Sequence, residues 1–360
     1  MNYSIHTYEL SARINFNEFF EIYESLKEFK PSIQKEHRSC FSANVRQTVY
    51  HFRQLDGAYG IDCITLNKID SGPAMLEADI SFIINPYNTV NMQKHSDAHI
   101  VDAECLSAST IYIIGILEKI LPINVMRRIE LSRVDFCTNL KFQTQQQAEE
   151  YISLLHLGIP PKVLKERRIF DTTQRRYIPY KYAILLECGD YSVEIYSKYK
   201  QMENRFPSAS VEAAKGMVRI ELRANIEKIF RLMQRYNFPR MNVFEFLSEH
   251  YACRIYSEEL PGIIASMVGN GNFVPYNDII QRIEHSDFQD RTKKKMAAVC
   301  AYFSGRKYSN RFLSDSDLTH KDWKNILNKF NHIQCSPIPV PPTFSLQKYP
   351  GVASWDPAFS

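Results

Sequence analysis

The stretch 216–223 reads Gly-Met-Val-Arg-Ile-Glu-Leu-Arg, and apolar side chains alternate along it with charged ones. Alternate residues of a β-strand point to opposite faces of a sheet, so the pattern predicts a strand with one apolar and one charged face. The apolar face consists of Val218, Ile220 and Leu222, and the charged face consists of Arg219, Glu221 and Arg223. A half-exposed antiparallel sheet gives such a pattern without any further role.

Three other predicted strands carry charged side chains on one face in the same way. These side chains are Glu194, Tyr196 and Lys198 in 191–198, Arg133 and Asp135 in 131–138, and Glu77 and Asp79 in 76–84. Clustered carboxylates repel one another unless a cation joins them. If the four polar faces coincide, we expect Mg²⁺ or Mn²⁺ to neutralise the repulsion among their carboxylates, because both ions prefer oxygen ligands.

Outward from these strands, the chain has the pattern of an α+β fold. Apolar residues recur at helical spacing in 17–26, 103–121 and 144–157. Thr144 and Gln147 stand at capping-box spacing at the start of the third helix. Strands at 182–187 and 191–198 flank a Cys-Gly-Asp turn, which is a hairpin signal.

The pattern becomes almost wholly helical after Asn225 and continues so to Gln334, and closely spaced prolines follow. We therefore predict an antiparallel-sheet domain at 1–225, an all-α domain at 226–335 and an extended Pro-rich tail at 336–360. The predicted fold class is α+β.

The composition excludes several classes of protein. With 360 residues, 44% apolar and 23% charged, the chain is expected to form two or three globular domains rather than a collagen, a coiled-coil rod or a mainly disordered chain. We find no apolar run of membrane-spanning length and no signal peptide, and the eight cysteines contain no CxxC pair. These features predict a cytoplasmic protein without a membrane partner. The sequence has no Gly-rich phosphate loop, so no nucleotide cofactor is expected.

Positive charge is concentrated in two windows, although the net charge is only +4. Residues 162–181 contain seven Lys or Arg against two acids, and residues 291–329 contain ten against three. Such concentration is what a phosphate backbone attracts. We expect DNA contacts from Arg175 and Arg176 in the first window and from Lys293, Lys294, Lys321 and Lys324 in the second. Solvated basic faces, and a plain helical bundle in place of a helix-turn-helix-like reader, are the alternatives.

The phenol of Tyr196 suits phosphodiester chemistry on such DNA. A free phenol has a pKa of about 10, so it needs activation before it can attack. Lys198 stands two residues further on, about 6 to 7 Å along the same strand face, and would favour the phenolate. We therefore hypothesise that Tyr196 attacks a DNA phosphorus beside a metal ion, and that a 3′-hydroxyl leaves.

Three stretches, in order, resemble motifs of one family. They are Glu-Leu-Ser-Arg-Val-Asp at 130–135, Glu-Ile-Tyr-Ser-Lys-Tyr-Lys-Gln-Met-Glu at 194–203, and the opening stretch 216–223. Together they resemble the gene II replication initiation protein family of filamentous phages, which is related to the rolling-circle plasmid initiators. A weaker match runs from Asp79 to Pro86. The resemblance spans most of residues 1–335.

The resemblance implies a metal-dependent, site-specific DNA-nicking enzyme that initiates rolling-circle replication in a bacterial host cell. The tyrosine of the family's Tyr-x-Lys block falls on Tyr196, its lysine on Lys198, and its metal-side acids on Asp135 and Glu221, with Asp79 weaker. Origin DNA, a host helicase and a polymerase are the implied partners, and Arg133, Arg219 and Arg223 the DNA contacts nearby. The chain lacks the His-hydrophobic-His metal pair of better-known initiators.

Two other functions share part of this pattern. A non-enzymatic DNA-binding regulator of a phage or plasmid would bind the origin without cutting it. A conjugative relaxase would use the same tyrosine chemistry for DNA transfer.

Overall fold

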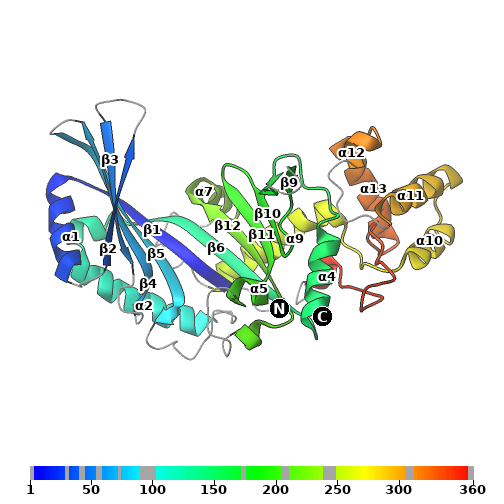
Figure 1. Ribbon diagram of the computed structural model, residues 1–360, viewed down its shortest axis with the longest axis horizontal. Coiled ribbons are helices and arrows are strands. Elements are labelled where there is room, and N and C mark those ends of the chain that lie inside the picture. Colours follow the sequence, from blue (N-terminus) through cyan, green and yellow to red (C-terminus); the bar gives the residue numbers. More distant parts are fainter. Residues whose placement is uncertain are drawn as a thin grey trace. The chain divides into compact units, whose positions relative to one another are not determined.

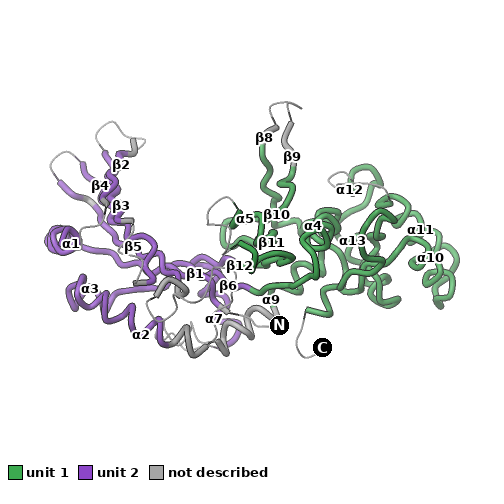
Figure 2. Tube along the Cα trace, turned by 60° about the horizontal axis from the view of Figure 1, so that its bottom comes forward, with its two compact units in different colours: residues 1, 138–222, 254–360 green, residues 2–137, 223–253 purple. Residues whose placement is uncertain are grey.

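The computed structural model describes residues 4–28, 32–39, 45–53, 59–71, 74–89, 103–171, 176–203, 211–237, 249–304 and 312–355. The chain divides into two compact units, each made of separate segments (Figure 2). Unit 1 contains residue 1, 138–222 and 254–360, and unit 2 contains 2–137 and 223–253. The domain boundaries predicted at 225 and 335 stay a prediction.

Unit 2 combines antiparallel strands with helices. Its elements are β1 (Ser4–Ile14), α1 (Phe16–Glu28), β2 (Ser32–Ser39), β3 (Val45–Arg53), β4 (Tyr59–Ser71), β5 (Ala74–Thr89), α2 (Ala103–Ile120), α3 (Ile123–Met126), most of β6 (Glu130–Lys141), the end of β12 (Met217–Asn225) and α7 (Ile226–Arg235). The strand order is β2-β3-β4-β5-β1-β6. Neighbouring strands pair antiparallel throughout this order.

Apolar residues alternate along β5 with more exposed ones, and this alternation determines which face of the sheet the helices cover. Ala78, Ile80, Phe82 and Ile84 are buried, whereas the intervening residues are half-buried. Helices α1 and α2 pack against β5, as Figure 1 shows, and bury their own apolar stripes there. The apolar face of the strand, which has a two-residue period, and the apolar stripes of the helices, which have a 3.6-residue period, therefore pack together in one core.

Unit 1 combines four paired strands with the C-terminal helices. Its elements are α4 (Gln145–Leu155), β7 (Lys165–Glu166), β8 (Ile169–Asp171), β9 (Arg176–Ile178), β10 (Ala183–Glu187), β11 (Tyr191–Ser197), α5 (Lys198–Glu203), η2 (Glu212–Ala214), most of β12, α9 (Glu249–Val268, from 254), α10 (Tyr276–Glu284), α11 (Asp290–Phe303), α12 (Phe312–Asp315), α13 (His320–His332) and η3 (Val352–Trp355). Its strand order is β12-β11-β10-β7, and β8 pairs with β9 in a separate two-stranded sheet. Both β6 and β12 contribute residues to each unit.

The α+β fold class predicted from the sequence is confirmed, with a large antiparallel sheet followed mainly by helices. The capping box at the start of α4 is present, because Thr144 accepts from the Gln147 backbone and Gln147 reaches back. Strands β2 and β7 to β9 were not predicted, since their residues lack a regular apolar alternation. Among the described residues, no helix has both the length and the apolar composition to cross a bilayer.

The Pro-rich segment after Gln334 has little regular structure and packs into unit 1. Cys335, Ile338 and Val340 are buried, and isolated bridges join the segment to residues 272–275. Further on, Glu150 of α4 accepts hydrogen bonds from the backbone N–H of Ser345 at 3.1 Å and its hydroxyl at 2.5 Å, and from Tyr349. The carboxylate thus fastens the segment to α4.

Glu150 gives this attachment a pH dependence. Burial alone would raise the pKa of Glu150, but the hydrogen bonds from Ser345 and Tyr349 outweigh it and hold the pKa below its usual range. Because the folded pKa is lowered, Glu150 stabilises the fold fully above about pH 5, and this contribution is lost as the pH falls through the folded pKa.

We expect Glu150→Ala to lower the free energy of unfolding by about 2 kcal/mol at pH 7, and the loss to shrink as the pH falls to 3. Urea unfolding of both proteins over that pH range measures the difference. Glu212→Ala is the control, since Glu212 forms an exposed pair with Lys215 that contributes about 0–1 kcal/mol. A pH-independent loss at Glu150 would contradict the expectation.

Candidate active site

Tyr196 and Glu221 meet in unit 1, on the neighbouring strands β11 and β12. The Tyr196 hydroxyl donates to Glu221 Oε1 at 2.6 Å. Both side chains are buried, with 8% and 3% of their surface exposed. A carboxylate that accepts a hydrogen bond from a phenol is positioned to remove the phenolic proton. The pair therefore has the geometry of a nucleophile and its base.

Lys198 lies beside this pair, but not on the strand as predicted. β11 ends at Ser197, and Lys198 is the first residue of α5. Its Nζ lies 5.8 Å from the centre of the Tyr196 ring and donates to Gln201 Oε1 at 2.7 Å. The side chain is fully buried. An ammonium this close to the ring would stabilise a negative charge on the phenol oxygen.

Gln145, which the sequence analysis did not single out, holds the ends of β11 and β12 together. Its Nε2 donates to the Ser197 hydroxyl at 2.8 Å, and its Oε1 accepts from the Gly216 backbone N–H at 3.0 Å. The residue is the first of α4, directly after the N-cap Thr144. The capping-box spacing predicted where this helix begins. Nothing in the sequence indicated that the side chain of its first residue, Gln145, would bond to Ser197 and Gly216.

We expect Gln145→Leu to lower the free energy of unfolding by about 1–2 kcal/mol, because its side-chain hydrogen bonds to Ser197, Gly216 and Glu149 are lost at a partly buried position. If Tyr196 acts as a nucleophile, the same change should lower kcat more than it raises KM, because the substitution disturbs positioning rather than DNA contacts. Gln143→Ala, at an exposed position two residues earlier, is the matched control. Equal effects of the two variants would show that Gln145 has no positioning role.

Arg219 does not lie on an exposed charged face of β12. It was predicted to contact DNA, but the side chain is fully buried, and its Nε donates to Asn139 Oδ1 at 2.9 Å. The opposite face of β12 is also buried, at Val218, Ile220 and Leu222. A guanidinium in the interior offers no surface to a phosphate, so this arrangement does not fit a DNA contact at Arg219.

Asp135, in unit 2, is surrounded by two of the predicted arginines. Its Oδ1 accepts from Arg133 Nε and from Arg223 Nε, both at 3.1 Å, and Arg133 also pairs with Glu9 at 3.4 Å. Asp135 has 2% of its surface exposed, whereas the arginines are half-buried. The two guanidinium groups already compensate the carboxylate, which explains its burial without a metal ion.

Asp79 stands apart from Asp135 within the same unit. It lies opposite Arg13 on β1, whereas Asp135 lies opposite Thr7, six residues away along that strand. Six residues of strand span about 20 Å, so the two carboxylates cannot share one ion. Desolvation, with the neighbouring charge of Glu77, raises the pKa of Asp79 despite a hydrogen bond from Asn67. Asp79 therefore does not belong to a site that includes Asp135.

The described residues contain no group of three or more His, Cys, Asp or Glu side chains placed to hold a metal ion. Of the three predicted ligands, Glu221 bonds to Tyr196, Asp135 to arginines, and Asp79 to Asn67. The residues therefore do not form a ready-made carboxylate cluster, and the predicted Mg²⁺ or Mn²⁺ stays a prediction.

The remaining predicted DNA contacts lie in unit 1. Arg175 lies outside the described residues, and Arg176 opens β9 opposite Asp171. On α11, Lys294 is exposed and Lys293 donates to the Glu284 carbonyl at 2.8 Å. Lys321 and Lys324 are exposed on α13. This helix has a capping box at Thr319 and buries Trp323, Ile326, Leu327 and Phe330. These four lysines stay predicted DNA contacts.

Comparison with known proteins adds two weak structural likenesses. No protein-family model matches the chain, and no curated protein matches it. A rolling-circle replication initiator protein from Geobacillus stearothermophilus aligns at a TM-score of 0.33 and 11% identity, over 94% of this chain and 98% of that one. The di-domain ARO/CYC BexL from the BE-7585A biosynthetic pathway aligns at 0.23 and 7%, over 73% and 94%. TM-scores this low carry no functional argument, so this chain is only weakly similar in structure to a rolling-circle replication initiator.

Proposed function

We propose that the chain is a site-specific DNA-nicking enzyme that initiates rolling-circle replication, with Tyr196 as its nucleophile. The observation that carries this proposal is the 2.6 Å hydrogen bond from the Tyr196 hydroxyl to Glu221, with the Lys198 ammonium 5.8 Å from the same ring. A buried structural tyrosine needs only some acceptor. A carboxylate and an amine at one phenol supply both requirements of nucleophilic attack, removal of a proton and stabilisation of the resulting charge.

The proposed step forms one bond and breaks one. Glu221 takes the phenolic proton, and the Tyr196 oxygen attacks the phosphorus of a DNA phosphodiester in line. The bond between phosphorus and the 3′-oxygen breaks, and that oxygen leaves and takes up a proton. The products are a 5′-phosphotyrosine link and a free 3′-hydroxyl that can prime synthesis. Because the link is itself a phosphodiester, a later 3′-hydroxyl can reverse the step and close a strand.

Access to Tyr196 sets a condition on this step. Since the side chain has 8% of its surface exposed, covering groups must move for a phosphodiester to reach the phenol. DNA binding therefore precedes attack, and the enzyme should be inert toward small phosphodiesters that cannot supply the binding energy for that movement.

The experiment that tests the proposal is incubation of the full chain with supercoiled plasmid that carries the DNA flanking its own gene. Formation of nicked circles, with a protein–DNA adduct that survives denaturant and has a free 3′-hydroxyl, supports the proposal. Binding without any nick supports the non-enzymatic regulator instead. Nicking without an adduct would indicate hydrolysis, and would also overturn the proposed step. Cutting confined to a transfer origin would favour the relaxase.

The same assay tests the proposed divalent cation. We expect nicking to stop in EDTA and to return on addition of Mg²⁺ or Mn²⁺, because a bound cation would polarise the scissile phosphate. DNA binding in EDTA, measured by fluorescence anisotropy, is the control, and it should change much less than nicking. Full nicking in EDTA would contradict the cation requirement and leave the tyrosine step untouched.

A further inference from the structure

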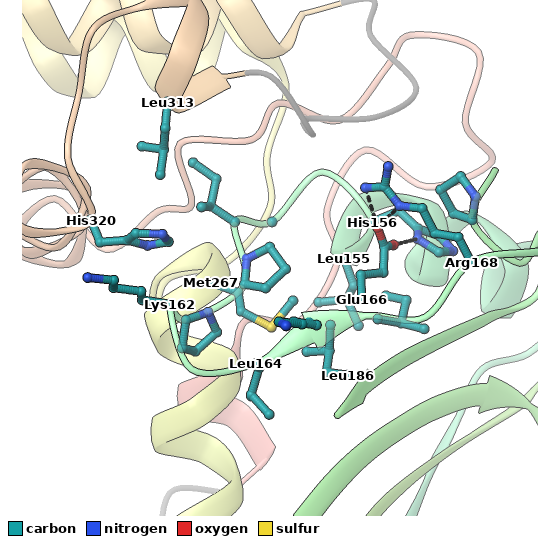
Figure 3. Close-up of a pocket in the computed structure, with 17 residues that line it drawn as sticks. Leu155, His156, Lys162, Leu164, Glu166, Arg168, Leu186, Met267, Leu313 and His320 are labelled. Carbon is teal, nitrogen blue, oxygen red and sulfur yellow. Dashed lines mark hydrogen bonds and ion pairs between the residues drawn. The ribbon is translucent and has the colours of Figure 1, made fainter. Parts of the chain in front are cut away.

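A pocket of about 370 Å³ opens in unit 1, between α4, β7, α9 and α12 (Figure 3). Small-molecule sites in proteins have volumes of about 300–1,000 Å³, so it can hold a small organic ligand. Ten of its seventeen lining residues are apolar side chains or prolines, including Leu164, Leu186 and Met267. No residue of the proposed nicking site lines it. The middle of the pocket is therefore apolar.

Basic side chains stand on two sides of this apolar middle. Figure 3 shows Lys162 and His320 together on one side, and Arg168 with His156 on the other. Lys165 also lines the pocket. Among the lining residues, Glu166 is the single carboxylate, so the pocket has an excess of two positive charges even with both histidines neutral. An anionic ligand with two separated charges would meet a cation at each end.

Glu166 offsets the charge of Arg168, but it also holds the Arg168 guanidinium in place at the pocket wall. Arg168 Nη2 and Nε donate to Glu166 Oε2 at 2.7 and 2.9 Å, and His156 Nδ1 lies 3.6 Å from Oε1. Burial alone would raise the pKa of Glu166, but the neighbouring His156 and the Arg168 guanidinium hold it below the usual range. The carboxylate stays ionised and fixes the guanidinium in one orientation at the pocket wall, which lowers the entropic cost of binding an anion there.

We propose that this pocket binds one nucleotide unit of single-stranded DNA, with its base on the apolar middle and its two flanking phosphates at the cations on either side. A nucleotide within a strand has a phosphate on its 5′ side and another on its 3′ side, which matches cations on two sides of an apolar surface. Only an unstacked base can insert into an apolar pocket, and the bases of a duplex are stacked. Single-stranded DNA is therefore favoured over a duplex. The proposal does not depend on nicking, because Tyr196 takes no part in it.

The test uses deoxythymidine 3′,5′-bisphosphate as the probe and the full chain as the protein. By calorimetry, we expect the bisphosphate to bind about tenfold or more tightly than the 5′-monophosphate, and both more tightly than inorganic phosphate. Lys162→Glu should remove most of the advantage of the second phosphate. Lys348→Glu, which reverses an exposed lysine that does not line the pocket, is the matched control and should leave the affinity within twofold.

Two further measurements distinguish loss of binding from misfolding, and binding of a DNA strand from binding of a free nucleotide. Leu313→Trp adds bulk from a half-buried lining position and should weaken the probe without changing the thermal midpoint by more than a few degrees. A single-stranded oligonucleotide should displace the bisphosphate. If inorganic phosphate binds as well as the bisphosphate, or Lys162→Glu and Lys348→Glu behave alike, the proposal is wrong. Displacement by free nucleotides but not by the oligonucleotide would overturn the assignment to a DNA strand.

Discussion

Tyr196→Phe is expected to lower nicking of the origin plasmid by about 10³-fold or more and to abolish the covalent adduct, while DNA affinity stays within about threefold. The Tyr196 hydroxyl supplies the proposed attacking oxygen. Its removal therefore prevents bond formation altogether and does not merely weaken stabilisation of the transition state. Gel analysis of plasmid topology measures nicking, and detection of labelled DNA on the denatured protein measures the adduct.

The structure requires a stability control for this variant. Phenylalanine leaves the Glu221 carboxylate, which is 3% exposed, without the hydrogen bond it accepts at 2.6 Å. A lost hydrogen bond to a buried charged group costs about 1–3 kcal/mol. Rates should therefore be compared well below both thermal midpoints. Tyr199→Phe, three residues further on in α5, is the matched control and should nick normally. If Tyr196→Phe still cut with an adduct, another tyrosine would be the nucleophile.

Gly216→Val is expected to destabilise the protein by about 3 kcal/mol or more and to reduce nicking with it. Gly216 has φ +71°, in the left-handed region, where a side chain costs about 1–2 kcal/mol. An added Cβ would also lie 2.4 Å from the Phe142 carbonyl oxygen, a backbone atom that cannot move away cheaply. The Gly216 carbonyl accepts from the Phe142 N–H at 2.8 Å, so the clash disturbs the start of β12, five residues before Glu221.

Gly189→Ala provides the comparison for this change. Gly189 lies in the turn between β10 and β11, and a Cβ there would meet nothing within 4 Å. Replacement should therefore change the free energy of unfolding by less than about 1 kcal/mol. Urea unfolding of the three proteins gives the difference. Equal stability of Gly216→Val and Gly189→Ala would mean that the β12 start adapts to a side chain, contrary to the strain argument.

Local patterns in the sequence determined many of the elements and their apolar faces, but not β2 or β7 to β9. The alternation at 216–223 gave β12 and the buried set Val218, Ile220 and Leu222. The spacing of Thr144 to Gln147 gave the start of α4. Each of these signals lies within a few residues of chain, because strand period, helix period and capping hydrogen bonds are all local. The Tyr-x-Lys block, which is equally local, is what singles out Tyr196 among the 21 tyrosines of the chain.

Only the tertiary structure decided what covers the polar faces and which charges meet. It placed Arg219 in the interior against Asn139, surrounded Asp135 with arginines, separated Asp79 from Asp135, and began a helix at Lys198 where a strand was expected. It also brought Gln145 to Gly216 and built the pocket around Glu166 from segments as distant as 155 and 320. A strand's period says which residues share a face but not what packs on that face, because that depends on strand order, register and contacts between residues far apart in the chain.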